Sequence, residues 1–203
     1  MQPLELYIHI PFCVKKCAYC DFLSGPAGEK EKEEYVKMLV DEIRNCPDTV
    51  QNYRVISIFF GGGTPSLLTG EQIGRLMDTV REIFTLDEDA EITMEMNPGT
   101  VTEEKLRKYR QAGGNQSVND AELRLLGRIH TYEEFREAYH LARANGFSNI
   151  NVDLISAIPG QTVESWRRTL EQVMALSPEH ISAYSLILEE GTTFYKKYVE
   201  DEA

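Results

Sequence analysis

Residues 55–66 read VISIFFGGGTPS, an almost unbroken apolar run followed by three glycines and a proline. Strands of a parallel sheet that are buried on both faces are typically this apolar, whereas half-exposed strands alternate apolar and polar residues. Glycines directly after the run favour a tight loop in which the backbone can lie close to another group. The stretch therefore predicts a central parallel strand, covered on both faces, that ends in a glycine loop.

On either side of this stretch, strand and helix patterns alternate along the chain. Strands are expected at 4–10, 55–60, 90–96, 147–158 and 180–188, and helices at 29–46, 70–84, 102–112, 118–127, 132–145 and 162–176. Thr69 and Thr131 each begin a capping box, which marks a helix start. This alternation predicts an α/β fold of βαβ units with a parallel sheet and right-handed crossovers. It leaves open whether the sheet is doubly wound or forms a barrel or part-barrel.

Composition limits the classes of function. The chain has 203 residues, of which 42% are hydrophobic and 27% charged, as expected for one globular domain. No apolar run reaches the ~18 residues of a membrane helix, and the first residues lack a signal-peptide pattern, so we expect a cytoplasmic protein without a transmembrane segment. A net charge of −12, without a basic stripe, indicates that nucleic acid is not a partner.

Three of the four cysteines lie in residues 9–22, HIPFCVKKCAYCDF. Cys13, Cys17 and Cys20 have the spacing C-x3-C-x2-C and follow the first predicted strand, at the edge where parallel α/β folds place their sites. In a reducing compartment, clustered cysteines bind metal or carry out redox chemistry more often than they form disulfides. Cys46 lies late in a predicted helix and matches no ligand position.

The triplet is compatible with two metal sites. Thiolates are soft ligands that suit zinc or iron–sulfur clusters. His9 could complete a Cys3His zinc site, because structural zinc takes four protein ligands. Without His9, three thiolates suit a four-iron cluster with one iron left open for another ligand. The charged insert Lys15-Lys16 argues against three cysteines buried in a core.

The stretch YIHIPFCVKKCAYCDF at 7–22 resembles the signature of the radical S-adenosylmethionine superfamily. GGGTPS, MEMNPGT, VDLISAIPGQT and ISAYSLILEEGT extend the resemblance along nearly the whole chain. Together they are most similar to the group of oxygen-independent coproporphyrinogen III oxidase and the haem chaperone HemW. The resemblance implies a radical SAM core domain over residues 1–203, folded as a partial (β/α)6 TIM-like barrel. It also implies a [4Fe–4S] cluster on Cys13, Cys17 and Cys20, with S-adenosylmethionine on the open iron.

The resemblance further implies the cofactor-binding residues and the partners. The cofactor-binding residues are Tyr7, Tyr19, Gly62, Gly63, Thr64, Glu95, Gln116, Arg128, Asp153 and Ile155. Asp153 lies within an apolar strand, where a carboxylate needs a partner. The implied partners are S-adenosylmethionine, an electron donor protein, and haem or a porphyrinogen.

Three departures from the family pattern affect the function that we expect. Phe22 stands where the oxidase has a fourth cysteine, which favours a haem chaperone over an oxidase. Relatives have a barrel strand where this chain has only residues 113–117, so we expect most of one strand to be deleted there, the Gln116 site to be displaced or lost, and the barrel to have a gap. Relatives also continue beyond residue 203 into a domain that contributes to haem or substrate binding. The alternatives are a Cys3His zinc module and an inactive, truncated relative.

Overall fold

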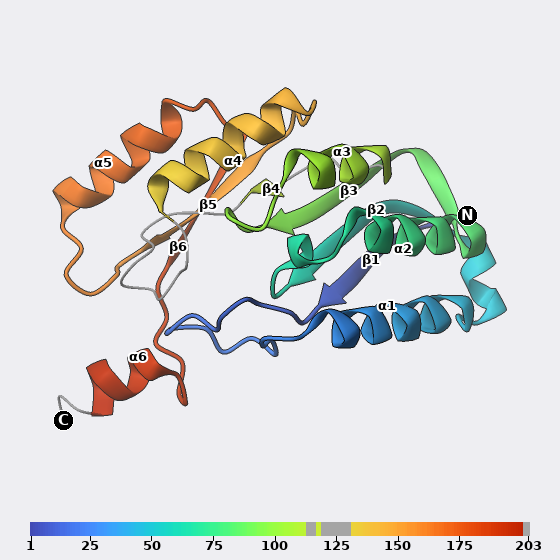
Figure 1. The fold of residues 1–203 in the computed structure, drawn as a ribbon, viewed down its shortest axis with the longest axis horizontal. Coiled ribbons are helices and arrows are strands. Elements are labelled where there is room, and N and C mark those ends of the chain that lie inside the picture. The colour runs from blue at the N-terminus through green and yellow to red at the C-terminus, as the bar shows by residue number, and fades with distance from the viewer. Residues whose placement is uncertain (113–116, 119–130, 201–203) are drawn as a thin grey trace.

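The computed structural model describes residues 1–112, 117–118 and 131–200 (Figure 1). The strands are β1 (Gln2–Ile10), β2 (Tyr53–Gly62), β3 (Thr85–Met96), β4 (Ser117–Val118), β5 (Asn151–Ser156) and β6 (His180–Ser185). The α-helices are α1 (Glu29–Arg44), α2 (Gly70–Ile83), α3 (Glu103–Ala112), α4 (Tyr132–Ala144), α5 (Val163–Met174) and α6 (Thr193–Tyr195). No helix in these described ranges is long and apolar enough to cross a membrane.

All strand pairs in the described residues are parallel, which confirms the predicted α/β fold. The strands form one sheet in the order β1-β2-β3-β4 and a second sheet of β5 and β6. Ile10 at the end of β1 lies opposite Gly62 at the end of β2, so the carboxyl ends of these strands meet at one edge. Between β4 and β5 the described strands are not paired, and the barrel is not closed.

Strand β4 bears on two of the sequence predictions. Ser117 and Val118 pair with Glu95 and Met96 of β3, so Val118 belongs to a strand and not to the helix predicted at 118–127. The described part of the strand expected to be deleted near 113–117 is thus these two residues, whose backbone groups find partners at the edge of β3. Residues 113–116 and 119–130, and with them Gln116, Arg128 and the rest of the predicted helix, lie outside the described residues.

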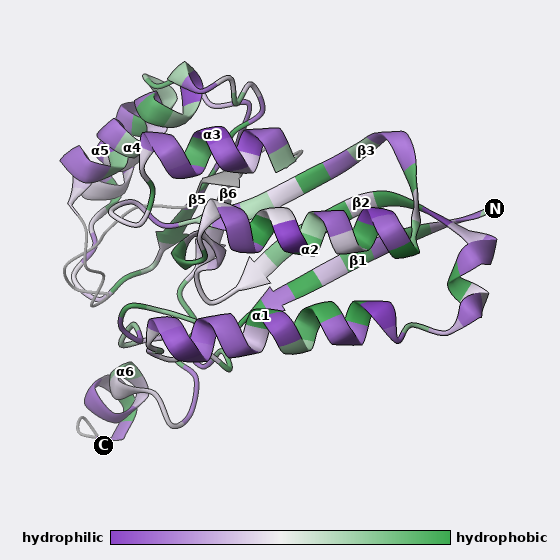
Figure 2. Ribbon diagram, turned by 45° about the vertical axis from the view of Figure 1, so that its right-hand side comes forward, coloured by the Kyte–Doolittle hydropathy of each residue, from purple (hydrophilic) through white to green (hydrophobic). Residues whose placement is uncertain are grey.

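Helices cover one face of the larger sheet. Figure 2 shows α1, α2 and α3 along β1–β3, while α4 and α5 lie beside β5 and β6. Side chains alternate along a strand, and accordingly Ile58 and Phe60 are fully buried. Phe59 points to the opposite face, where its ring stacks on Tyr7 with 5.9 Å between the centroids.

The prediction that β2 is covered on both faces is only partly correct. Val55, Ile58 and Phe60 are fully buried, but Ile56 is 40% exposed. The register between β1 and β2 shifts at this point, because Leu4 pairs with Val55 and Glu5 with Ser57, which leaves Ile56 as the extra residue of a β-bulge. A bulge leaves one residue unpaired and changes the direction of the side chains next to it.

Both predicted capping boxes are formed. The Thr69 Oγ1 accepts from the Gln72 backbone N–H at 3.2 Å, and the Gln72 Oε1 accepts from the Thr69 N–H at 2.8 Å. The hydroxyl of Thr131 accepts from the Glu134 N–H at 3.3 Å in the same way. Each box satisfies two backbone donors at a helix start, which explains why α2 and α4 begin where the sequence predicts.

Candidate metal centre

The cysteine loop leaves the carboxyl end of β1 and is held at its base. The Cys13 N–H donates to the Gly25 carbonyl at 2.9 Å, and the Gly25 N–H donates to the Pro11 carbonyl at 3.0 Å. The buried Phe12 ring lies edge-on against Tyr35 of α1, with 5.2 Å between centroids. The base of the loop is thus fixed by backbone pairing and by a core aromatic contact, while its cysteines are half-buried.

One pocket joins this loop to the ends of two further strands. It is lined by the cysteine loop, by the loop after β2 and by the end of β3 with the turn that follows. The predicted site residues in its lining are Cys13, Cys17, Tyr19, Cys20, Gly62, Gly63, Thr64 and Glu95. The structure therefore brings eight of the predicted residues to the carboxyl edge of adjacent parallel strands, where such folds bind ligands.

Glycines are required where the β2 loop meets the cysteine loop. A Cβ on Gly63 would lie 2.6 Å from the backbone oxygen of Phe12, and Gly62 has a φ of +113° with its missing Cβ directed at the His9 ring. The Gly63 N–H donates to the Ile10 carbonyl at 2.8 Å. The glycines predict that the backbone lies close to another group. Within the described residues, that group is the protein's own β1 and cysteine loop.

Glu95 is the one carboxylate among the described residues that line the pocket. Its Oε2 accepts from the Gly62 N–H at 3.1 Å, and the side chain is half-buried. Burial, together with the negative charge of Glu95, raises the pKa of Tyr7. The lining of the pocket therefore includes a carboxylate held by the backbone of the loop after β2.

Thr64 is buried between the cysteine loop and the end of β3. Its hydroxyl lies 3.7 Å from the Cys13 Sγ as donor and accepts from the Asn97 Nδ2 at 2.8 Å. The hydroxyl proton and one of the two acceptor lone pairs of Thr64 are therefore used inside the protein.

Three predicted residues lie elsewhere in the described structure. Tyr7 is 59% exposed on the sheet face opposite the helices, here called the inner sheet face, and its hydroxyl lies 3.3 Å from the His9 Nδ1. Asp153 finds the partner that its position requires, because its Oδ1 accepts from Asn151 at 2.5 Å. Ile155 and Tyr19 pack against a second, small apolar cluster around Ile158 and Phe194. None of these contacts places Tyr7, Asp153 or Ile155 in the pocket lining.

Several pocket residues were missed by the sequence analysis. Met96, Asn97, Thr100, Lys16, Phe22 and Ser24 also line the pocket. The position of Asn97 was a usable signal, because polar residues at the carboxyl ends of parallel strands often face the site. Cys46 follows α1, which ends at Arg44. Its Sγ donates weakly to the Glu42 carbonyl at 3.8 Å, in keeping with a structural role.

The donor set fits an iron–sulfur cluster better than a single zinc ion. Among the described residues, no three His, Cys, Asp or Glu side chains are arranged around one metal position. The His9 Nε2 lies 3.5 Å from the Leu23 carbonyl, and the ring packs over Gly62, so a Cys3His site is not formed. In a four-iron cluster each thiolate binds a different iron, which three half-buried cysteines around a shared pocket can provide.

The fold and the pocket define a parallel α/β protein with a three-cysteine loop at the carboxyl edge of its strands. The family model described as the Radical SAM superfamily matches residues 7–173. The chain therefore belongs to the radical SAM superfamily. Membership implies a [4Fe–4S] cluster and S-adenosylmethionine as cofactors.

Named relatives indicate which group within the superfamily this chain resembles. The chain is 40% identical over 205 residues to the heme chaperone HemW of Haemophilus influenzae, covering 96% of this chain and 54% of that protein. It is 43% identical over 201 residues to the heme chaperone HemW of Escherichia coli, with 96% and 53% covered. The coproporphyrinogen III oxidase HemN of Escherichia coli superposes with a TM-score of 0.84 at 34% identity, over 92% of this chain and 44% of that one. The chain thus spans about half the length of the curated relatives it matches.

Proposed function

We propose that Cys13, Cys17 and Cys20 hold a [4Fe–4S] cluster and that S-adenosylmethionine binds beside it. The observation that carries this proposal is the convergence of the cysteine loop, the glycine loop and Glu95 on one pocket. When bound, the cluster supplies one-electron chemistry to S-adenosylmethionine, while the protein orients both and shields them from water. The two sheets would then be parts of a partial (β/α)6 barrel around this site.

The described residues suggest how S-adenosylmethionine is oriented. The Glu95 carboxylate, held by the Gly62 N–H, is placed to accept from an ammonium group, as in the methionine part of the cofactor. Tyr19 and Ile155, which pack against the same small cluster, form an apolar flank for the adenine.

Four other predicted cofactor residues lie outside the pocket lining or outside the described residues. Tyr7 lies near Glu95 on the inner sheet face and Asp153 on β5, and both remain proposed contacts. Gln116 and Arg128 are expected to contact the ribose and carboxylate groups of the cofactor, and they lie outside the described residues.

For the whole protein we propose a cytoplasmic haem-chaperone role, with haem or a porphyrinogen as ligand and an electron donor protein as partner. Two features support the chaperone over oxidase activity. The matched relatives at 40% and 43% identity are named heme chaperones. Phe22, which stands where the oxidase pattern has a fourth cysteine, lines the pocket and is 68% exposed.

Anaerobic reconstitution with iron and sulfide tests the proposal. We expect iron and acid-labile sulfide to bind, and the electron paramagnetic resonance spectrum of the reduced protein to change when S-adenosylmethionine is added. A spectrum that ignores S-adenosylmethionine would contradict the cofactor site. A folded protein that binds zinc, or no metal at all, would contradict the cluster itself.

Cysteine variants provide the matched control for this experiment. Cys17→Ser removes a thiolate from the pocket, and we expect it to lose most of the bound iron. Cys46→Ser changes a cysteine outside the pocket lining, and we expect iron content and spectrum to stay as in the unmodified protein. Equal iron loss in both variants would show that the triplet is not the ligand set.

A further inference from the structure

One cysteine of the triplet has a hydrogen-bond donor from the protein. The Thr64 Oγ1 lies 3.7 Å from the Cys13 Sγ, within the range for a hydrogen bond to sulfur, and Thr64 is only 2% exposed. The two residues are 51 positions apart in the chain and meet because β1 and β2 end side by side. A buried hydroxyl next to a metal-binding sulfur can influence the metal as well as the packing.

Asn97 determines the direction of the Thr64 hydroxyl. The Asn97 Nδ2 donates to the Thr64 Oγ1 at 2.8 Å, so the oxygen acts as acceptor on that side. The hydroxyl proton of Thr64 is then free to point at the Cys13 Sγ. A hydroxyl can both donate and accept, and here the two roles are assigned to different partners.

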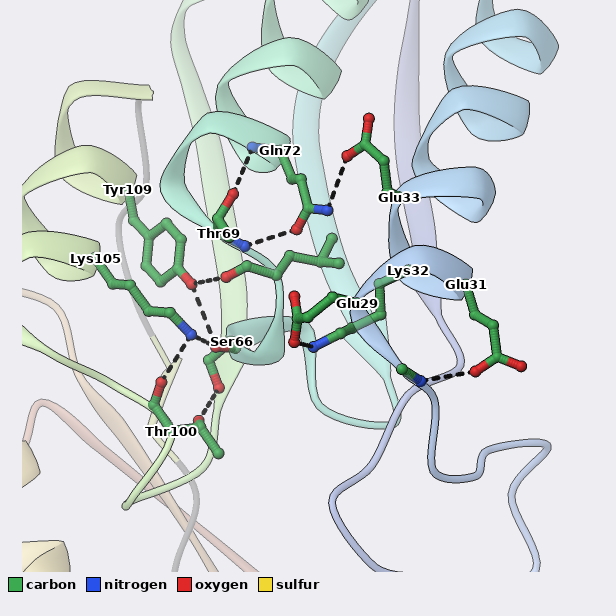
Figure 3. A network of polar contacts seen from close by, with 12 residues as sticks. Glu29, Glu31, Lys32, Glu33, Ser66, Thr69, Gln72, Thr100, Lys105 and Tyr109 are labelled. Atoms are coloured by element: carbon green, nitrogen blue, oxygen red, sulfur yellow. Dashed lines mark hydrogen bonds and ion pairs between the residues drawn. The ribbon is translucent and has the colours of Figure 1, made fainter.

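Asn97 is itself held by a closed ring of hydrogen bonds. The Asn97 N–H donates to the Ser66 Oγ at 3.1 Å, and the Thr100 Oγ1 donates to the Asn97 carbonyl at 2.6 Å. The hydroxyls of Ser66 and Thr100 lie 2.6 Å apart, and this pair is drawn in Figure 3. Since Thr100 uses its proton on Asn97, Ser66 donates to Thr100 and every member has a defined role.

Lys105 of α3 anchors this ring from the side away from the pocket. Its Nζ donates to the Ser66 carbonyl at 2.9 Å and to the Thr100 carbonyl at 3.1 Å, as Figure 3 shows. Burial, together with the positive charge of Lys32, lowers the pKa of Lys105. Helix α3 and the turn after β3 therefore fix the atoms that orient Thr64.

We propose that Thr64, oriented by Asn97, is a positioning residue that raises the reduction potential of the cluster through its hydrogen bond to the Cys13 sulfur. The inference rests on the proposed cluster site. Hydrogen bonds to cluster sulfurs are one of the means by which proteins set the potential. A donor withdraws negative charge from the thiolate, and it stabilises the reduced cluster, which carries more negative charge, more than the oxidised one.

Potentiometric titration of the reconstituted protein, followed by electron paramagnetic resonance, tests this inference. Thr64→Val keeps the shape of the side chain but removes the hydroxyl. We expect its cluster to be about tenfold harder to reduce, a fall of about 59 mV for a one-electron couple. Thr64→Ser keeps the donor and is expected to restore most of the potential, which a purely structural role of the methyl group would not do.

Two further variants complete the design. Thr93→Val makes the same change on β3 at a residue whose hydroxyl bonds only Glu91 among the described residues, and we expect the potential to stay unchanged. Asn97→Ala removes the group that orients Thr64 and is expected to lower the potential less than Thr64→Val does. If Thr64→Val binds no iron, the Asn97→Ala measurement decides the question.

The outcomes separate the inference from the proposed function. Unmodified protein that binds no cluster overturns the proposed function, and the inference with it. A normal cluster whose potential is the same in the unmodified protein, Thr64→Val and Asn97→Ala overturns the inference alone. A fall in potential that Thr64→Ser does not reverse also overturns it, because the hydroxyl would then not be the cause.

Discussion

At the scale of single residues, Gly62 and Gly63 set how closely two loops approach. The missing Cβ of Gly63 would meet the Phe12 backbone oxygen at 2.6 Å, a distance that real Cβ contacts do not reach. Since the Phe12 backbone pairs with Gly25, neither side of this contact can move without disturbing the base of the cysteine loop. The same glycines that look like a turn in the sequence are therefore a packing requirement of the site.

We therefore expect Gly63→Ala to reduce iron binding after reconstitution and to lower the melting temperature of the apo protein. Gly74→Ala is the matched control, because its added Cβ on α2 meets no atom within 4 Å. That variant should be more stable by up to about 1 kcal/mol, the usual helix preference of alanine over glycine. Normal iron content in Gly63→Ala would show that the two loops are not in contact in solution.

At the scale of helices and strands, the first two helices are joined by a charged side chain. Glu33 of α1 accepts from both terminal nitrogens of Arg75 on α2, at 2.8 and 2.6 Å, and from the Gln72 Nε2 at 3.1 Å. Gln72 is also the N3 residue of the capping box that begins α2, as Figure 3 shows. The Gln72 side chain thus caps the start of α2 and also contacts the neighbouring helix α1.

The Glu33 contacts predict a pH dependence of stability. The hydrogen bonds from Arg75 and Gln72 lower the pKa of Glu33 from 4.5 to about 2. A carboxyl whose folded pKa is lowered stabilises the protein above its unfolded pKa, and this contribution is lost as the pH falls through the folded value. We expect Glu33→Gln to be less stable than the unmodified protein at pH 6, and the difference to shrink between about pH 4.5 and pH 2.

Chemical denaturation at several pH values measures this difference. Glu34→Gln serves as control, because its exposed carboxylate has, among the residues that the structure describes, only a 3.8 Å contact with Lys30 within α1. Exposed pairs of this kind contribute little, so the control should follow the unmodified protein. A difference for Glu33→Gln that stays constant down to pH 2 would contradict the proposed contact.

The segment at α6 supports the cysteine loop from the opposite side. The Phe194 N–H donates to the Ala18 carbonyl at 3.0 Å, and its buried ring packs with Tyr19 and Ile155. We expect Phe194→Ala to increase hydrogen exchange at residues 17–20, while the free energy of global unfolding changes little. The apolar cluster around Phe194 is small, so local unfolding there breaks few contacts.

Hydrogen-exchange mass spectrometry compares this variant with Phe22→Ala. Phe22 is 68% exposed, so its truncation should leave the exchange in the loop nearly unchanged. Equal protection of residues 17–20 in Phe194→Ala and in the unmodified protein would mean that α6 does not hold the loop.

At the scale of the whole molecule, one apolar core joins the two sheets. Buried residues from both halves, such as Phe60 of β2 and Val152 of β5, belong to one continuous cluster, and Trp166 of α5 packs against it. The pairing of the described strands is interrupted between β4 and β5, but the apolar core formed by their side chains is continuous. The core therefore links the β1–β3 half to the β5–β6 half.

We expect a single cooperative unfolding transition of the apo protein. The fluorescence of Trp166, the chain's single tryptophan, reports on the β5–β6 half, whereas far-UV circular dichroism reports on all helices and strands. Coincident midpoints are the mark of two-state unfolding. Two separate midpoints, or a broad non-cooperative melt, would favour the alternative of a damaged, inactive relative.

Local features of the fold and the site could be predicted from the sequence. The capping boxes at Thr69 and Thr131, the alternation of strands and helices, and the C-x3-C-x2-C loop after β1 all depend on residues a few positions apart. Local hydrogen bonding and side-chain periodicity specify such features without knowledge of the rest of the chain. The same reasoning failed at Ile56 and Val118, where pairing with a distant strand decided the outcome, with β1 at Ile56 and with β3 at Val118.

By itself, then, the sequence determined the parallel α/β class and the three thiolates of the metal site, because both follow from short-range patterns of residue type. Only the tertiary structure decided which groups surround those thiolates. The contact of Thr64 with Cys13, the orientation of Thr64 by Asn97 and the packing of Phe194 on the cysteine loop join residues far apart in the chain. They exist because parallel strands end at a common edge, and the register that aligns those ends is set by the packing of the whole sheet.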